Sequence, residues 1–318
     1  MLAAAPLPGL RRPLLVAVGS ELEPVMAELE PSFERAHPGV DLRWQVLGSE
    51  DMLQRSLDPP AQRPRVLIPA NRRHLEELAE TLRVRGEGAG FVEDPRPIAR
   101  TLLVAVVWPE RAASLFPQGR FSIDRLRRAA AAGQWEKVGG TAEWGSFDLR
   151  ATDPLRSNSG QLTLALWCRG QPPPACTAAL RRALYRPARS TDILLREFIS
   201  AGPNEGDVAM VYEASALARS RQAEQKRPGG YSLLVPDPTF ETVLAAAIRR
   251  GRCEGSEADG RRFVGFLLGE PGQGLLRRGG FRNPQGRGGS PQGDRVKRME
   301  TPSRAELEEL LRLWQGAA

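Results

Sequence analysis

Apolar runs of strand length alternate with helix-period segments along the first third of the chain. Residues 14–18 form a continuous apolar run that ends at a glycine, as expected of a strand covered on both faces. The next segment places apolar side chains three and four positions apart, on one side of a helix: Leu22, Val25, Met26, Leu29 and Phe33. The same order repeats with strands at 40–47 and 66–68, each followed by a helical pattern. Repeated β–α units predict a parallel sheet with helices on its faces.

The rest of the chain keeps both patterns but mixes their order. Strands are predicted at 101–108, 146–151, 207–212 and 231–235, and helices at 123–132, 161–168 and around Phe263 to Leu276. Residues 285–298 are dense in Gly, Arg and Gln without apolar periodicity, which predicts a mobile loop. A final helix is predicted from the capping box of Ser303 and Glu306 and the apolar stripe that follows it.

Three strands run into a polar turn that opens a helix. The turns are Gly19-Ser20, Gly48-Ser49 and Ser157-Asn158-Ser159-Gly160. Ligands bind at the carboxyl ends of strands in open α/β sheets, and a helix N-terminus there presents free N–H groups. One such turn alone is also an ordinary helix cap, so the prediction of a ligand site rests on their recurrence.

A fourth apolar strand ends at Tyr212-Glu213. A carboxylate beside a phenol suits a cation or a substrate amine. Glu213 equally suits the first turn of a helix, where the helix dipole favours a negative charge. Both interpretations stay open at this stage.

Length and charge limit the classes of protein to which this chain can belong. A chain of 318 residues is long enough for two domains or two lobes. The formal net charge is +7, but only three of the 45 cationic side chains are lysine, and the arginines are interleaved with Asp and Glu along the chain. That spread is unlike the clustered basic face of a nucleic-acid-binding protein, so no nucleic-acid partner is predicted. The longest apolar runs reach only strand length, so no membrane insertion is predicted.

The sequence offers no assignable catalytic residue. It has two histidines, no Gly-x-x-x-x-Gly-Lys-[Ser/Thr] and no Gly-x-Ser-x-Gly, so we predict no enzyme activity and no cofactor. Without a Cys-x-x-Cys pair, no metal site is predicted. Cys168 and Cys176 bracket a proline-rich, turn-like run; their spacing permits one local disulfide in an oxidising compartment, although free thiols are the simpler expectation.

The chain resembles bacterial extracellular solute-binding proteins of the two-lobed Venus flytrap kind. Within them it is most similar to the class that includes molybdate-binding proteins, in the branch that occurs alone or beside von Willebrand factor A domains. The stretches that carry the resemblance are Glu143-Trp144-Gly145-Ser146-Phe147, Thr152-Asp153-Pro154, Ser157-Asn158-Ser159-Gly160, Gly206-Asp207-Val208-Ala209-Met210-Val211-Tyr212-Glu213, Phe263-Val264-Gly265-Phe266-Leu267-Leu268, Gly272-Gln273 and Gly280-Phe281-Arg282.

The resemblance implies a type II periplasmic-binding-protein fold, α/β in class, in which each lobe is a mostly parallel sheet flanked by helices. Lobe 1 would comprise residues 1–105 and 243–318, and lobe 2 residues 106–242, with hinge segments near 101–105 and 239–247. A small polar or anionic ligand would bind in the cleft between the lobes. The implied ligand-binding residues are Ser20 and Ser49 from lobe 1 and Ser157, Asn158, Ser159, Tyr212 and Glu213 from lobe 2.

The implied function is capture of the ligand for an ABC-type transporter or sensor, outside the cytoplasm, by a monomer. The implied partner is a membrane permease or another envelope protein. The first six residues show only the small-residue end of an export signal. The alternative is an interaction module of a cell-envelope assembly that keeps the fold but has a degenerate cleft. A cytoplasmic effector sensor is disfavoured because no helix-turn-helix segment is recognisable.

Overall fold

The computed structural model describes residues 11–58, 63–88, 90–251 and 254–316. The chain divides into two compact units. Unit 1 comprises Met1–Arg100 and Val243–Arg287, and unit 2 comprises Thr101–Thr242 and Gly288–Ala318. The strand β4 (Arg96–Val107) carries the chain from unit 1 into unit 2, and β8 (Thr239–Ile248) carries it back. The small-residue pattern at the start of the sequence lies outside the described residues.

Unit 1 is built from the β–α repeats that the hydrophobic periodicity predicts. Besides its parts of β4 and β8, its elements are β1 (Arg12–Val18), the 3-10 turn η1 (Ser20–Leu22), α1 (Glu23–Ala36), β2 (Val40–Val46), α2 (Ser49–Arg55), β3 (Val66–Ile68), α3 (Arg73–Val84), α10 (Glu254–Leu268) and α11 (Glu270–Arg278).

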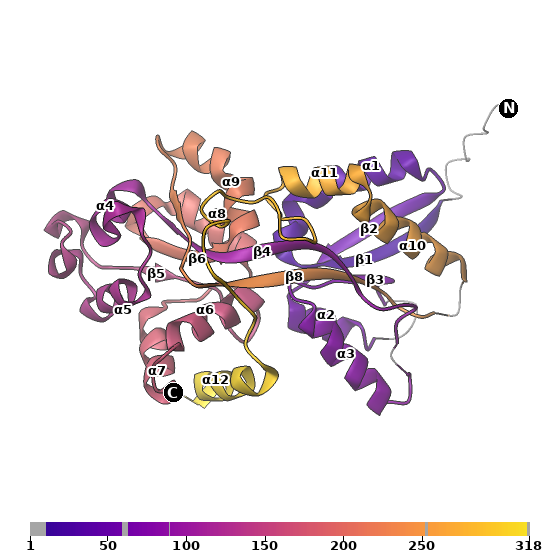
Figure 1. The fold of residues 1–318 in the computed structure, drawn as a ribbon, viewed down its shortest axis with the longest axis horizontal. Helices are drawn as coiled ribbons and strands as arrows, with labels where there is room; N and C mark the ends of the chain where they lie inside the picture. The colour runs from indigo at the N-terminus through magenta and orange to yellow at the C-terminus, as the bar shows by residue number, and fades with distance from the viewer. Residues whose placement is uncertain (1–10, 59–62, 89, 252–253, 317–318) are drawn as a thin grey trace. The chain divides into compact units, whose positions relative to one another are not determined.

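The unit 1 sheet has the order β2-β1-β3-β8. β1 pairs in parallel with both β2 and β3, whereas β8 runs antiparallel to β3. Helices α2 and α3 cover one face of this sheet, and α1, α10 and α11 cover the other (Figure 1). Because both faces are covered, β3 is buried along its whole length.

Unit 2 contains more helices than the sequence patterns predict. Besides its parts of β4 and β8, its elements are α4 (Pro109–Leu115), η2 (Pro117–Gly119), α5 (Ile123–Ala132), η3 (Trp135–Val138), η4 (Ala142–Trp144), β5 (Leu149–Arg150), α6 (Asn158–Cys168), α7 (Pro173–Ala183), α8 (Thr191–Ala201), η5 (Gly202–Asn204), β6 (Val208–Tyr212), α9 (Glu213–Lys226), β7 (Ser232–Leu234), β9 (Arg298–Met299) and α12 (Arg304–Gly316).

The unit 2 sheet is mixed rather than mostly parallel. Its β4 runs antiparallel to both β6 and β7, and β5 runs parallel to β6. The long strand β4 enters this sheet from unit 1 and meets strands that run the opposite way, so the prediction of a mostly parallel sheet fails here. The predicted strand 146–151 also shrinks to the two residues of β5. Helices α8 and α9 lie on one face of the sheet, and α6, α7 and α12 on the other (Figure 1).

Residues 288–318 belong to unit 2, whereas the resemblance implied that they would belong to lobe 1. Helix α12 packs on α7 and α6, and the side chain of Arg181 on α7 donates a 2.8 Å hydrogen bond to the carbonyl of Trp314. The predicted capping box is present: the Ser303 hydroxyl donates to Glu306 at 2.7 Å. The apolar stripe on α12 therefore has a partner within unit 2, which fixes where this segment belongs.

The segment predicted as a mobile loop has no helix or strand from residue 285 to 297. From Gly288 on, it is nevertheless tied to unit 2 by defined contacts. The backbone N–H of Ser290 donates to Glu213 at 2.9 Å, and that of Lys297 donates to Asp237 at 3.0 Å. The segment then pairs in parallel with β8 through β9.

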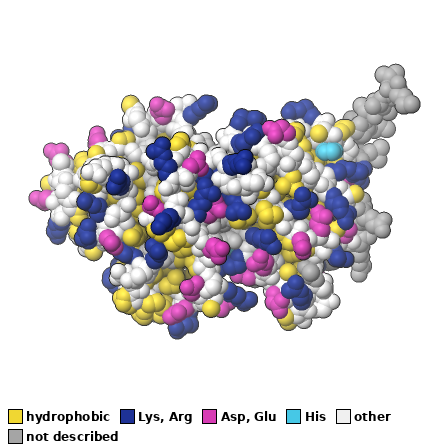
Figure 2. All heavy atoms as spheres, viewed as in Figure 1, with side chains coloured by type: hydrophobic (Ala, Val, Ile, Leu, Met, Phe, Trp, Pro, Cys, Tyr) yellow, Lys and Arg dark blue, Asp and Glu magenta, His cyan; other side chains and the backbone are white. Residues whose placement is uncertain are grey.

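Charged side chains of both signs are interspersed over the face of the molecule seen in Figure 2. No arginine-rich stripe stands out on that face, in keeping with the interleaved sequence. Within the described residues, no helix is both long enough and apolar enough to cross a membrane.

Candidate functional site

The carboxyl ends of three strands meet at one edge of the unit 1 sheet. Val18, the last residue of β1, is in register with Val46 of β2 on one side and with Ile68 of β3 on the other. Pairing continues into the turns, since the N–H of Gly19 donates to Ile68 at 2.9 Å and that of Leu47 donates to Val18 at 3.0 Å. The two Gly-Ser turns predicted from the sequence therefore follow neighbouring strands at the same edge.

Ser20 and Ser49 are the predicted ligand residues at this edge. Ser20 starts η1 and is 8% exposed, and Ser49 starts α2 and is 5% exposed. Neither hydroxyl has a hydrogen-bond partner among the described residues. Each hydroxyl can donate or accept, so together they can bind polar groups of either sign.

Glu21 is a feature of this edge that sequence reasoning missed. Its side chain is 3% exposed, and burial raises the pKa of the carboxyl from 4.5 to about 7. The sequence shows only an acidic residue in the first turn of a helix, which the helix dipole already accounts for. Its burial could not be read from the pattern, although its position directly after a predicted ligand serine was a signal.

In unit 2, the hydroxyl of Ser159 is the centre of a cluster of four. It lies 2.8 Å from the Thr152 hydroxyl, 3.0 Å from the Ser157 hydroxyl and 2.7 Å from the Thr191 hydroxyl. A serine hydroxyl donates one bond and accepts two, so three partners saturate it. Ser159 is fully buried and acts as a junction between α6, α8 and the segment that precedes α6.

The carboxyl end of β6 reaches the N-terminus of α6. The side-chain amide of Asn158 donates a 2.7 Å hydrogen bond to the phenol oxygen of Tyr212. Ser157 is the N-cap residue of α6, and its side chain makes no capping bond to the helix. The structure thus brings Asn158 and Tyr212 together, and a role for them and for Ser157 in ligand binding stays a prediction.

Glu213 points to a different part of unit 2. Its Oε1 accepts hydrogen bonds from the backbone N–H and the hydroxyl of Ser290, at 2.9 and 2.6 Å. The side chain is fully buried. A structural role for Glu213, anchoring the segment after unit 1, accounts for these contacts.

Gly160 lets the first turn of α6 approach the preceding segment closely. A Cβ at this position would lie 2.5 Å from the carbonyl oxygen of Thr152 and 2.8 Å from the backbone nitrogen of Pro154. Contacts this short to backbone atoms require glycine. The predicted turn of Ser157 to Gly160 is in fact the cap and first turn of α6, which begins at Asn158.

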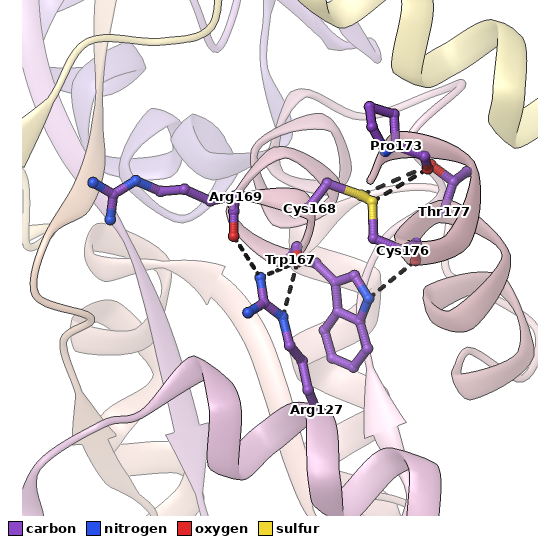
Figure 3. The surroundings of a disulfide bond; sticks show 7 residues. All are labelled: Arg127, Trp167, Cys168, Arg169, Pro173, Cys176 and Thr177. Carbon is purple, nitrogen blue, oxygen red and sulfur yellow. Dashed lines mark hydrogen bonds between the residues drawn. A yellow bond between two sulfur atoms is a disulfide. The ribbon is translucent and has the colours of Figure 1, made fainter. Parts of the chain in front are cut away.

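Cys168 and Cys176 form a disulfide between the end of α6 and the first turn of α7 (Figure 3). The simpler expectation of free thiols is therefore wrong. The Cα atoms are 5.2 Å apart, because α7 starts at Pro173 and folds back beside α6. The indole N–H of Trp167 donates to the Cys176 carbonyl at 3.1 Å, and Arg127 donates to the carbonyls of Trp167 and Arg169.

Among the described residues, no three His, Cys, Asp or Glu side chains are grouped so that they could hold a metal ion. The residues predicted to bind a ligand in the two units carry hydroxyl, amide, phenol and carboxyl groups. Such donors and acceptors can hold a small polar molecule by hydrogen bonds.

These two α/β units, each with polar turns at the carboxyl ends of its strands, have the architecture of type II periplasmic binding proteins. The sequence agrees with the fold: residues 14–282 match the family described as bacterial extracellular solute-binding protein, and the chain belongs to that family. A search of curated proteins finds no match to the sequence.

Solved structures with the same fold include several binding proteins. A periplasmic thiamin binding protein is 13% identical, with a TM-score of 0.70 and 97% of each chain covered. AfuA from Actinobacillus pleuropneumoniae, with fructose-6-phosphate bound, is 14% identical, with a TM-score of 0.68 over 96% of this chain and 97% of that one. The sulfate-binding protein SubI from Mycobacterium tuberculosis H37Rv is 16% identical, with a TM-score of 0.62 over 86% and 87%. The family and these neighbours are binding proteins, not enzymes.

Proposed function

We propose that this chain captures a small polar or anionic solute outside the cytoplasm and delivers it to an ABC-type transporter or sensor. The turns of both units are proposed to contact the solute. Membership of the extracellular solute-binding family supports the general role. The Cys168–Cys176 disulfide supports an oxidising, extracytoplasmic compartment, because such bonds are rare in the cytosol.

The observation that carries the proposal is the pair of serine hydroxyls at the carboxyl ends of β1 and β2. Ser20 and Ser49 keep their hydroxyls without a partner among the described residues, at the edge of the sheet where α/β proteins bind ligands. A hydroxyl retained for packing alone would normally bond to a nearby backbone group. In unit 2, Ser157, Asn158 and Tyr212 are proposed to supply the remaining contacts.

The test is a titration of the purified protein with sulfate, molybdate, fructose 6-phosphate and thiamin, followed by thermal unfolding. A solute at a hundredfold excess over its Kd stabilises the folded state by about 2.7 kcal/mol. The double variant Ser20→Ala, Ser49→Ala should weaken binding by about tenfold or more, since each lost hydrogen bond contributes roughly 1 kcal/mol. Ser220→Ala, which removes an exposed hydroxyl on α9, is the matched control. Equal affinity in the double variant and the control would contradict the proposed role of the two serines.

A second candidate function is an interaction module of an envelope assembly that keeps the fold without carrying a solute. It is favoured by one observation: Ser159 and Glu213, two of the predicted ligand residues, are bonded inside unit 2. A folded Ser20→Ala, Ser157→Ala variant separates the two functions. Loss of solute binding supports capture and delivery, whereas unchanged recovery of an envelope partner, with no solute binding in the parent protein, supports the interaction module.

A further inference from the structure

Glu21 carries a buried carboxylate oxygen without a partner. Its Oε1 makes no hydrogen bond with any described residue, although the side chain is only 3% exposed. The backbone N–H of Glu21 itself favours the ionised form, but desolvation outweighs it and raises the pKa of the carboxyl. Buried polar atoms in folded proteins nearly always have partners, so an exception at a ligand-binding edge calls for an explanation.

The carboxylate lies against the backbone of Gly19. A Cβ built at Gly19 would stand 2.3 Å from Oε1 and 2.6 Å from Oε2 of Glu21. The backbone angles of Gly19 are φ −66° and ψ 156°, which any residue adopts. The glycine is therefore needed for space rather than for conformation, and the space it leaves is filled by this carboxylate.

The polar groups without a partner at this edge determine which kind of solute could bind there. Ser20 and Ser49 offer hydroxyls that donate or accept, and Glu21 offers an oxygen that accepts and, once ionised, carries a negative charge. A charged N–H donor makes the strongest hydrogen bond to such an oxygen. A bare oxyanion would instead meet a like charge.

A metal ion fits this edge less well than an organic cation. Calcium is held by six to eight oxygen ligands, commonly with several carboxylates. The described residues contain no group of three His, Cys, Asp or Glu side chains that could hold a metal. An ammonium group carries a positive charge and three N–H donors, so a single carboxylate oxygen can bind it without further acidic side chains.

We propose that Oε1 of Glu21 accepts a hydrogen bond from an ammonium group of the solute, so that the ligand class is small amines and zwitterions rather than simple oxyanions. This inference rests on the proposed solute-binding function and narrows it. Gly19 is assigned the supporting role of admitting the carboxylate to the edge of the sheet.

The test compares the parent protein with Glu21→Gln and with the matched control Glu28→Gln. Glu28 is an exposed acid on α1 whose side chain is 64% exposed and pairs with Arg278 at 3.7 Å. Putrescine and arginine represent the amine class, and sulfate and molybdate represent the oxyanions. Calorimetric titration is expected to show binding of an amine probe, weakened about tenfold or more by Glu21→Gln and unchanged by Glu28→Gln.

The outcomes separate this inference from the function on which it rests. Sulfate or molybdate binding that Glu21→Gln leaves unchanged would overturn the ammonium assignment and retain solute capture. The absence of any binding in both probe classes, together with no co-purified solute in native mass spectra, would overturn both. Should Glu21→Gln not fold, Glu21→Asp keeps the charge on a shorter side chain. It is expected to weaken amine binding, and unchanged amine affinity in a folded Glu21→Asp protein would overturn the assignment.

Discussion

The side-chain amide of Asn158 and the phenol oxygen of Tyr212 are joined by a 2.7 Å hydrogen bond, although 54 positions separate them in the sequence. The bond connects the first turn of α6 to the last residue of β6. Both side chains are almost fully buried, with exposures of 3% and 1%. Two predicted ligand residues thus hold each other in position.

Tyr212→Phe tests the energetic weight of this bond. The variant keeps the ring but leaves the buried Asn158 amide without that acceptor, so the free energy of unfolding should fall by about 1–3 kcal/mol. Urea denaturation followed by circular dichroism measures the change. Tyr185→Phe is the control, because Tyr185 is 66% exposed and should lose almost nothing. A similar loss of stability in both variants would show that the hydrogen bond between Asn158 and Tyr212 does not contribute to the free energy of unfolding.

Gly160→Ala should destabilise the protein through a backbone clash. The new methyl group would meet the Thr152 carbonyl at 2.5 Å and force α6 away from the preceding segment, at a cost of about 1–3 kcal/mol. Gly265→Ala in α10 provides the contrast, since nothing apart from its neighbours in the helix lies within 4 Å of its added Cβ. That variant should gain about 0.5–1 kcal/mol from higher helix propensity. Thermal melts of the pair test the opposite signs, and two changes in the same direction would contradict the prediction.

The disulfide predicts a specific thiol count. The sequence has three cysteines, so denatured, unreduced protein should react with one equivalent of a thiol reagent and reduced protein with three. Replacing Cys168 and Cys176 together by serine should lower the free energy of unfolding by about 2–3 kcal/mol, the loop-closure entropy of so short a loop. Three reactive thiols before reduction would refute the pairing.

The raised pKa of Glu21 predicts that the free energy of unfolding falls as the pH rises. The folded-state pKa of about 7 lies above the unfolded value of 4.5, so between these values the folded state holds a proton that the unfolded state has released. The contribution of this group is therefore fully present below pH 4.5 and is lost as the pH rises through 7, by on the order of 3 kcal/mol.

Glutamine does not titrate, so the Glu21→Gln variant should not show this loss of stability as the pH rises. The stability difference between the variant and the parent protein should grow from pH 5 to pH 8, as measured by urea denaturation at several pH values. Glu28→Gln should follow the parent protein at every pH. A constant difference between Glu21→Gln and the parent would show that Glu21 titrates normally in the folded state.

Hydrophobic periodicity was sufficient to predict most of unit 1. The alternation of apolar runs and amphipathic segments located β1 to α3 because each element buries one continuous surface that its own sequence reveals. The capping box at Ser303 was equally local, and the structure confirms it. Elements whose signal lies within about ten residues could be predicted in this way.

Two of the helices that were missed begin at prolines, where local rules gave the wrong answer. Helix α7 starts at Pro173, inside a run of prolines that suggested a turn. Proline is tolerated in the first turn of a helix, where its missing N–H has no partner to lose, so the run marked the start of a helix. The same reasoning applies to α4, which starts at Pro109.

The sequence predicted which chemical groups the candidate site offers, but not which of them are bonded to other residues of the chain. The sequence indicated which turns carry hydroxyl and amide groups, but the internal partners of two such residues lie far away along the chain. Ser159 is bonded to Thr191, and Glu213 to Ser290, and no local pattern identifies either pair. Burial of Glu21 is likewise a property of the folded sheet edge rather than of its neighbours in sequence.

The packing of α12 on α7 determines how the two units could be expressed separately. A truncation after Thr242 would strip away α12 and leave its apolar partner surface in contact with water, so such a fragment should aggregate. A recombinant unit 2 should instead fuse residues 101–242 to residues 288–318 through a short flexible linker. Unit 1 likewise requires a splice between Arg100 and Val243, so neither half can be expressed as one uninterrupted stretch of the gene.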